Sequence, residues 1–398
     1  MIRPIRVIRV KSIFIMKTQL TSETNLIIIP MLMLTLIGII AIWFVSPASN
    51  LFQTEPILSR TNLAQAMSYQ PIKQTLFALL GLLLFILISR WNYYSFRKYS
   101  VALYLIMILF LMALIFYGKF SHGSRRWIDM GPFAFQPSEY MKIITVLVLG
   151  RYLMHKTNIT TLKGLFIPYL LVLVPMGLIL IQPDLGTALV FLPMLFVMVY
   201  VAGARVKYLL ITIFIGMLFI PLAYLWLMKD YQKTRLHVFL NPSKSPTADG
   251  YHLLQSRIAI GSGGFWGSFW RDSDQAPTIF VPSRHNDFIF TVIAEKWGFV
   301  GVSIVLFLYL MLIASSLFIA ASTREPYGRL IIVGITAYLT TQIIINIAMT
   351  VGLAPITGIT LPLISYGGSS LTSTFIALAF IFNIRNKQIP TFSSRDFE

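Results

Sequence analysis

A short polar segment, residues 282–290, combines side chains suited to acid–base chemistry with a position at the edge of an apolar run. It reads Pro-Ser-Arg-His-Asn-Asp-Phe-Ile-Phe, and Asp287 is its only carboxylate. A carboxylate at the entrance of a membrane span is partly desolvated, and desolvation raises its pKa toward that of a working base. The alternative is that Asp287 caps the helix that follows, which needs no catalytic role. Asp287 is therefore the first candidate catalytic residue.

The composition indicates that this residue belongs to a membrane protein. Of the 398 residues, 57% are hydrophobic and 12% are charged, whereas a soluble domain has about 25% charged residues. Apolar runs of about 20 residues can cross a hydrocarbon core of roughly 30 Å, and such runs must be helical because the core holds no water. We predict an all-α polytopic membrane protein with about ten transmembrane helices. The predicted spans are residues 25–46, 73–90, 101–118, 141–155, 164–182, 185–202, 207–228, 288–320, 328–351 and 365–384.

The distribution of charge predicts the orientation of these spans. If the N-terminus is cytoplasmic, 18 of the 32 Lys and Arg residues fall in inner segments, as the positive-inside rule requires. Both termini are then inside, and the net charge of +18 fixes topology rather than binding nucleic acid. We expect a basic segment at 1–24, one membrane domain at 25–384 and a cytoplasmic tail at 385–398. The long outer loop between spans seven and eight covers about 229–287.

Three other polar clusters fall on the predicted outer side. In residues 123–142, adjacent arginines suit phosphate recognition, while Glu139 and Lys142 are three apart on one helix face; a helix cap with a local ion pair explains the same spacing. In residues 182–187, Asp184 fits a tight turn that caps the next helix. In residues 358–370, proline, glycines and serines favour a broken or re-entrant helix that lines a polar cavity, or else close helix packing by small residues.

The long loop and the span after it add further candidates. The glycine run at 261–264 could present backbone amides to an anion, but it lacks the lysine of a phosphate-binding loop. A loop of this length is more often functional than not. Thr291 and Glu295 follow Asp287 at intervals of four, which predicts that the three share a helix face. The chain has no cysteine, so no disulfide framework is expected.

Taken in order, these motifs resemble those of the SEDS family of peptidoglycan polymerases, which includes RodA and FtsW. The shared segments here are Arg-Arg-Trp at 125–127, Phe-Gln-Pro-Ser-Glu at 135–139, Gln-Pro-Asp-Leu-Gly-Thr-Ala at 182–188 and Gly-Tyr-His at 250–252. They continue with Ala-Ile-Gly-Ser-Gly-Gly at 259–264, Asp-Phe-Ile-Phe at 287–290 and Ser-Tyr-Gly-Gly-Ser-Ser at 365–370. The resemblance covers about residues 40–384. Pro-Ser-Arg-His before the aspartate is closer to RodA, whereas residues 358–362 are closer to FtsW.

The resemblance implies polymerisation of lipid II, the undecaprenyl-pyrophosphate-linked disaccharide-pentapeptide, into β-1,4 glycan strands in the bacterial cytoplasmic membrane during elongation. It implies Mg²⁺ or Mn²⁺ as a cofactor, with no organic cofactor, and Asp287 and Glu139 are the candidates to hold the metal. The implied partner is a class B penicillin-binding transpeptidase, and lipid II, undecaprenyl pyrophosphate and membrane lipids are the implied small-molecule contacts.

The resemblance assigns site residues by motif. Asp287 matches the essential aspartate, as base or metal-bound organiser, and Glu139 orients Lys142 or shares the metal with Asp287. The remaining expected substrate-binding residues are Arg126, Trp127, Lys142, Arg235, Gln255, Ser256, Arg284, His285, Ser365 and Tyr366.

The chain departs from the family pattern at several positions. Asn286 stands where threonine is usual, and Lys296 with Trp297 replaces the second acid and the leucine of the following run. Ser283 replaces a glutamate of elongation members, and residues 268–281 diverge. Lys296 beside Glu295 could neutralise it and alter the electrostatics of the cavity. Two other functions remain open, a lipid II flippase or other transporter, and an inactive scaffold that recruits the transpeptidase; an FtsW-like septal role is the alternative within the family.

Overall fold

A computed structural model describes residues 25–45, 69–117, 119–121, 124–129, 134–155, 159–226, 228–240, 248–269 and 286–387. Ten of the helices in these ranges match the ten predicted spans, and seven are long and apolar enough to cross a membrane. The fold is therefore a polytopic helical membrane protein, as predicted. The ten helices are Asn25–Val45, α3 Gln70–Arg90, α4 Tyr93–Tyr117, α5 Pro137–Leu153, α6 Leu162–Ile181, α7 Leu185–Val201, α8 Val206–Trp226, α11 Ile289–Ser322, α12 Pro326–Val351 and α13 Gly368–Lys387.

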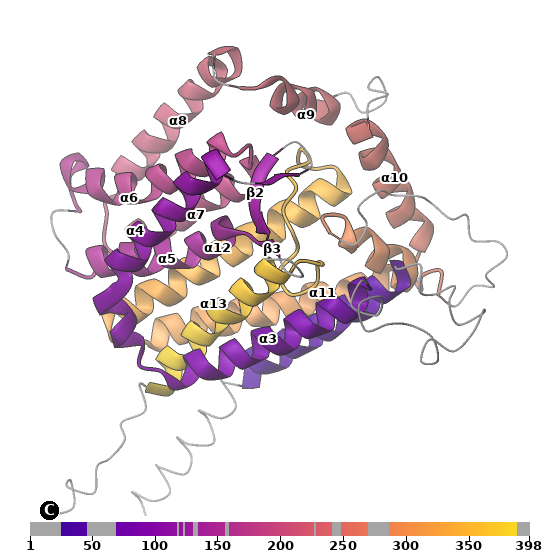
Figure 1. The fold of residues 1–398 in the computed structure, drawn as a ribbon, viewed down its shortest axis with the longest axis horizontal. Helices are drawn as coiled ribbons and strands as arrows, with labels where there is room; N and C mark the ends of the chain where they lie inside the picture. Colours follow the sequence, from indigo (N-terminus) through magenta and orange to yellow (C-terminus); the bar gives the residue numbers. More distant parts are fainter. Residues whose placement is uncertain are drawn as a thin grey trace, which may run out of the picture.

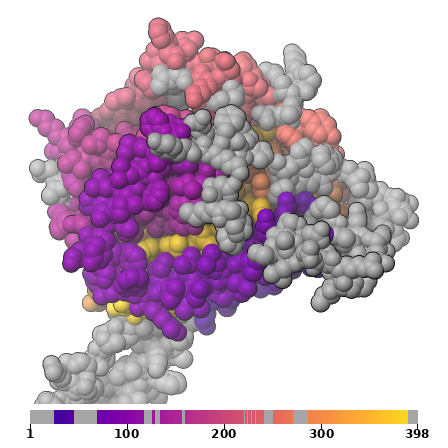
Figure 2. Space-filling model, in the orientation of Figure 1, coloured from indigo at the N-terminus to yellow at the C-terminus, as the bar shows by residue number. Residues whose placement is uncertain are grey.

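The helices α12, α5 and α13 form the centre of the bundle. α12 packs against α5, α7 and α11, and α13 lies along α3 (Figure 1). On the face shown in Figure 2, yellow residues near the C-terminal end of the described chain form a narrow strip between purple segments. α8 makes few contacts with the rest of the bundle, and most of its apolar side chains are exposed, as expected of a helix that faces lipid. Two of the polar clusters found in the sequence, residues 123–142 and 358–370, thus lead into the central helices α5 and α13, whereas the cluster at 182–187 lies between α6 and α7.

The helix α11 has 34 residues, about 51 Å at 1.5 Å per residue, which is too long for a single untilted crossing. Its helical geometry breaks at Gly298, where φ is 63° and ψ is −156°. The break allows α11 to pair with the segment after α10: the Ser268 amide donates to the Glu295 carbonyl at 2.8 Å, and the Phe299 amide donates to the Gly264 carbonyl at 2.9 Å.

The glycine run at 261–264 is a packing feature in this arrangement. Gly263 lies so close to the backbone of α11 that a Cβ there would collide with the Ala294 carbonyl oxygen. This contact requires a residue without a side chain. The structure therefore gives the run a packing role at Gly263, and anion binding by its backbone amides stays a prediction.

Two parts of the fold lie outside the ten-helix prediction. The long loop contains the helices α9 Asp230–Leu240 and α10 Ala248–Gly263. The segment before α5 forms a small antiparallel sheet of β1 Lys119–Ser121, β2 Ser124–Asp129 and β3 Ala134–Phe135, in the order β1-β2-β3. These elements are too short and too polar to span a membrane, so the hydrophobic runs that revealed the other helices carry no signal for them.

Candidate active site

Asp287 lies in the turn of residues 286–288 that leads into α11. The Asn346 side chain, from α12, donates to the Asp287 carbonyl oxygen at 2.9 Å, and the Ser365 hydroxyl donates to the Asn286 carbonyl oxygen at 2.7 Å. Two elements distant in sequence thus hold the backbone of this turn. The Asp287 carboxylate itself is half-buried and forms neither a hydrogen bond nor an ion pair with the residues that the structure describes.

Neither of the sequence-based placements of Asp287 in a helix is correct. Phe288, not Asp287, is the N-cap residue of α11, and no side chain caps it. Asp287 therefore precedes the helix on which Thr291 and Glu295 lie, and it shares no helix face with them. Hydrogen bonds from Asn346 and Ser365 instead hold the backbone of residues 286 and 287 in a turn before the helix.

Burial raises the pKa of Asp287 from its ordinary value to about 6. The positive charges of Arg235 and Arg126 act in the opposite direction, and the negative charge of Asp184 adds to the increase. At neutral pH the carboxylate is therefore ionised, but it binds a proton more readily than an exposed aspartate does. This is the balance that a general base needs.

Arg126, from β2, is held by the turn between α6 and α7. Its Nε donates to the Gln182 carbonyl at 3.1 Å, a terminal guanidinium nitrogen donates to the Pro183 carbonyl, and another lies 3.7 Å from Asp184. The Asp184 carboxylate also accepts from the Thr187 amide at 3.2 Å, which caps α7 as the sequence predicts. The Arg126 side chain is 22% exposed and that of Asp184 is 3% exposed. The aspartate therefore anchors a cation that still reaches the surface.

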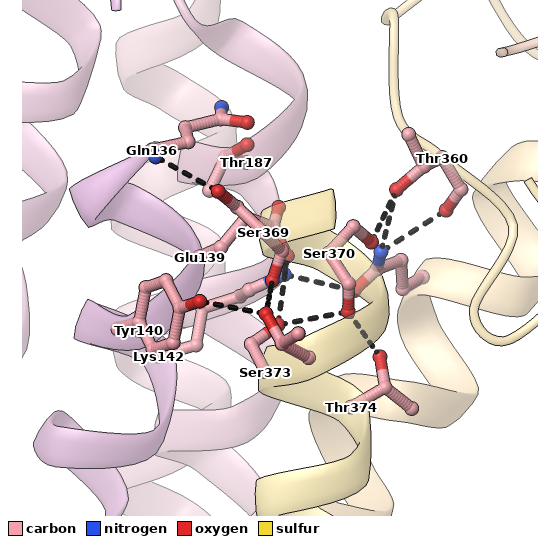
Figure 3. Close-up of polar contacts among 12 residues, drawn as sticks. Gln136, Glu139, Tyr140, Lys142, Thr187, Thr360, Ser369, Ser370, Ser373 and Thr374 are labelled. Carbon is pink, nitrogen blue, oxygen red and sulfur yellow. Dashed lines mark hydrogen bonds and ion pairs between the residues drawn. The ribbon is translucent and has the colours of Figure 1, made fainter. Parts of the chain in front are cut away.

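Glu139 and Lys142 form a buried ion pair at the start of α5. The Lys142 ammonium donates to the Glu139 carboxylate at 2.9 Å and to the side-chain oxygen of Gln342 at 2.9 Å, and the Ser373 hydroxyl donates to the same carboxylate at 3.3 Å (Figure 3). Pro137 and Glu139 occupy the first turn of the helix, as predicted. Lys142 thus has two oxygen partners within the protein, and Glu139 orients it.

A row of amide side chains on α12 connects this ion pair to Asp287. Gln342 accepts from Lys142 and donates to the Thr360 carbonyl at 3.0 Å. Asn346, one turn further along α12, donates to the carbonyls of Asp287 and Ile359, the latter at 2.6 Å. Both amides therefore bind the segment at 352–367, which is non-helical and joins α12 to α13. A polar cavity lined by this segment stays a prediction, and Gly368 packs closely against Phe77, as the alternative of small-residue packing expects.

Ser365 and Gln74 complete the attachment of that segment. The Ser365 hydroxyl accepts from the Leu361 amide at 2.8 Å, and Gln74, on α3, donates to the Ser365 carbonyl at 3.1 Å. Gln74, Gln342 and Asn346 were absent from the sequence-based candidates. The sequence does mark these three residues, because each is an amide side chain inside an otherwise apolar span. Placing an amide in a membrane costs free energy unless the amide is hydrogen-bonded.

The remaining candidates fall in several places. Arg235 lies on α9 and Trp127 on β2, and Arg235 acts electrostatically on Asp287. Ser256, on α10, donates to the Thr350 carbonyl at 2.7 Å and is buried, so it ties α10 to α12. Gln255 and Tyr366 are half-buried. Arg284 and His285 lie outside the described residues.

Of the two acids expected to hold a metal ion, Glu139 and Asp287, only Asp287 has a carboxylate without a described bonding partner. The described residues contain no group of three or more His, Asp or Glu side chains that could hold an ion. Glu139 is engaged by Lys142 and Ser373, and the acid that acts on Asp287 is Asp184. Mg²⁺ is commonly held by one or two carboxylates together with substrate phosphates. The Asp287 carboxylate fits that mode of binding, with the phosphates supplied by a substrate.

Curated proteins similar to this chain include peptidoglycan glycosyltransferases and a sporulation protein. Peptidoglycan glycosyltransferase MrdB of Escherichia coli strain K12 is 37% identical over 306 residues, covering 77% of this chain and 82% of MrdB. Peptidoglycan glycosyltransferase RodA of Treponema pallidum is 32% identical over 92% of this chain and 98% of its own length. Stage V sporulation protein E of Bacillus subtilis is 34% identical over 93% of this chain and 98% of its own length.

Solved structures agree with these relatives. A chain from a structure described as the coordination of polymerization and crosslinking by a peptidoglycan synthase complex superposes with a TM-score of 0.77 at 30% identity, covering 92% of this chain and 98% of that chain. The rod shape determining protein RodA of Thermus thermophilus superposes with a TM-score of 0.66 at 28% identity, covering 91% and 96%. The family model for FtsW, RodA and SpoVE, described as cell cycle protein, matches residues 24–389. The chain therefore belongs to the FtsW/RodA/SpoVE family.

Proposed function

We propose that this protein is a peptidoglycan glycosyltransferase that polymerises lipid II, with Asp287 as its catalytic base. The observation that carries the proposal is the Asp287 carboxylate. It has no described hydrogen-bond or ion-pair partner, its pKa is raised to about 6 by burial, and the charges of Arg126 and Arg235 act on it. Membership of the family and the names of the relatives support the same reaction.

The proposed reaction transfers the growing glycan to a sugar hydroxyl. The 4-hydroxyl of an incoming lipid II attacks the anomeric carbon at the reducing end of the glycan, and Asp287 takes the hydroxyl proton. The bond from that carbon to the pyrophosphate oxygen breaks, so undecaprenyl pyrophosphate leaves and a β-1,4 linkage forms with inversion. Arg126 and Arg235 offset the negative charge that develops on the pyrophosphate. The buried Lys142 is a positioning residue in this scheme, since Glu139 and Gln342 already bind its ammonium.

Asp287 is the residue that would hold a divalent cation here, with the remaining ligands supplied by the substrate's phosphates. When bound, Mg²⁺ or Mn²⁺ would neutralise charge on the leaving group. We therefore expect chelation with EDTA to stop polymerisation and added Mg²⁺ or Mn²⁺ to restore it.

We further propose a role in cell elongation, together with a class B penicillin-binding transpeptidase. The elongation role is supported by Pro-Ser-Arg-His at 282–285 and by relatives named MrdB and RodA, although relatives named FtsW are also present. The partner is supported by the synthase complex in which a similar chain was solved. The proposed location is the bacterial cytoplasmic membrane, with both termini in the cytoplasm.

The test is reconstitution of the full chain with its transpeptidase, labelled lipid II and Mg²⁺, followed by gel separation of the glycans. The variants are Asp287→Asn and, as a matched control, Asp230→Asn, which changes an exposed acid at the start of α9 in the same loop. We expect a glycan ladder from wild type and the control and none from Asp287→Asn.

Two other results would contradict the proposal. A ladder that survives Asp287→Asn would refute the role of Asp287. The absence of a ladder from every protein, combined with movement of lipid II across a vesicle bilayer, would favour a transporter. Loss of cell shape in an Asp287→Asn strain would separate an enzyme from a scaffold, because a scaffold tolerates that change.

A further inference from the structure

A polar cavity lies at the opposite end of α5 from the candidate active site. Its volume is about 480 Å³, and it is lined by Tyr94, Arg97, Lys98, Arg151, Met154 and His155. Glu139 and Arg151 are twelve residues apart on α5, which corresponds to about 18 Å along the helix axis. The cavity therefore lies toward the predicted cytoplasmic side, on which 18 of the 32 Lys and Arg residues are expected.

The cavity has a positively charged lining, and hydrogen bonds between α4 and α5 fix its position. The Arg151 guanidinium donates to the carbonyls of Arg97 at 2.9 Å and Lys98 at 3.1 Å, which fixes α5 against the first turns of α4. Arg97 lies 5.5 Å from the centre of the Tyr94 ring. Among the described residues, none of the three basic side chains forms an ion pair. Glu325, an acid on the same side, instead accepts the Gly328 amide and caps α12.

Three cations around a cavity of this size attract an anion, and guanidinium groups suit phosphate in particular. Tyr94 and Met154 add a ring and an aliphatic side chain to the wall, which suits a ligand that also has a less polar part. Basic pockets between transmembrane helices on the cytoplasmic side bind anionic lipid headgroups. Neither α4 nor the C-terminal end of α5 takes part in the proposed reaction at Asp287.

We propose that the cavity lined by Tyr94, Arg97, Lys98, Arg151, Met154 and His155 is a binding site for a phosphate group, presented by an anionic phospholipid headgroup or by a soluble phosphate. Such a ligand would hold α4 and α5 together at this surface, and α5 carries the Glu139–Lys142 pair at its other end. The site is thus distinct from the one that binds the polymerisation substrate.

The test measures lipid retention by the purified full-length protein with native mass spectrometry. The probes are anionic phosphatidylglycerol and, as the reference, zwitterionic phosphatidylcholine, whose phosphate is balanced by a quaternary ammonium. The variant Arg97→Gln/Lys98→Gln removes two cations from the cavity and leaves the Arg151 contacts with backbone carbonyls in place. The matched control, Arg205→Gln/Lys207→Gln, removes two exposed cations at the start of α8 on the same predicted side, away from the cavity lining.

We expect the cavity variant to retain phosphatidylglycerol roughly 30-fold more weakly than wild type, since each basic residue near an anionic lipid contributes about fivefold. The control should retain it like wild type, and the single variants Arg97→Gln and Lys98→Gln should each lose about fivefold. Arg97→Lys, which keeps the charge, should retain most of the binding. Phosphatidylcholine retention should be the same in every protein.

A competition with inorganic phosphate identifies the source of the ligand. If phosphate at matched ionic strength displaces phosphatidylglycerol from wild type, the site recognises the phosphate group of the lipid. If phosphate alone raises the melting temperature of wild type but not of the cavity variant, and no lipid is retained, the ligand is a soluble phosphate. Equal loss of lipid in the cavity variant and the control, or no loss in either together with no effect of phosphate, would overturn the proposal. Because the readout is binding, failure of the polymerase proposal would leave this result unaffected.

Discussion

Asp287 and Glu139 are acids at the same end of the bundle in opposite electrostatic surroundings. Glu139 is buried beside Lys142 and accepts hydrogen bonds from it and from Ser373. Asp287 is half-buried, and its carboxylate has no bonding partner among the described residues, although α12 holds both regions through Gln342 and Asn346. A paired acid fixes the positions of helices, whereas an unpaired acid with a raised pKa can accept a proton. Replacing each acid should therefore affect different properties of the protein.

The largest expected effect is on catalysis. Asp287→Asn should lower the rate of glycan polymerisation by roughly 10²- to 10⁴-fold, the usual contribution of a general base. Because burial raises the pKa of Asp287 in the folded protein, the folded state binds this proton more tightly than the unfolded state does, and stability from this group falls as pH rises from about 4 to about 6. A neutral asparagine avoids that cost. At neutral pH the melting temperature should therefore be unchanged or higher, and a clear decrease would assign Asp287 a structural role.

Next in size is the effect of breaking the buried pair. Lys142→Met leaves Glu139 with the Ser373 hydroxyl but without its cation, and an uncompensated buried charge costs about 3–5 kcal/mol of unfolding free energy. Reversible unfolding in mixed micelles would measure the loss. The double variant Glu139→Gln/Lys142→Met should recover part of it, because no buried charge remains. Lys207→Met, at an exposed position, should change little. Equal stability of Lys142→Met and wild type would contradict the structural role of the pair.

A smaller effect is expected at Asn346. Asn346→Leu removes two hydrogen bonds to backbone carbonyls and should cost about 1–3 kcal/mol in stability. Asn383 offers a matched control, since its side-chain amide donates to the carbonyls of Ile88 and Trp91 at the other end of the bundle. Both leucine variants should be similarly destabilised, but only Asn346→Leu should slow polymerisation per folded molecule. A similar kcat for the two variants would mean that Asn346 does not position Asp287.

The helices and the Glu139–Lys142 pair could be predicted from the sequence, but the contacts between separate helices could not. Ten apolar runs had to be helices, and the spacing of Glu139 and Lys142 placed both side chains on one face of α5. The sequence could not show which faces of separate helices meet, so a lone amide such as Asn346 had no visible partner. The glycines at 261–264 were ambiguous for the same reason, because their contact with α11 arises only after the chain folds.

If Asp287 is the base of a polymerase, the rate of polymerisation must depend on pH through the ionisation of its carboxyl group. The rate is measured with wild-type protein at saturating lipid II, with thermal unfolding at each pH as a check that the protein stays folded. If Asp287 is the base, the rate is low when its carboxyl group is protonated, rises about tenfold per pH unit below its pKa and levels off above it. That pKa is about 6 in the protein without a bound cation, and a cation held by the carboxylate lowers it. If the rate stays constant as the pH passes through the pKa of Asp287 while the protein stays folded, Asp287 is not the base.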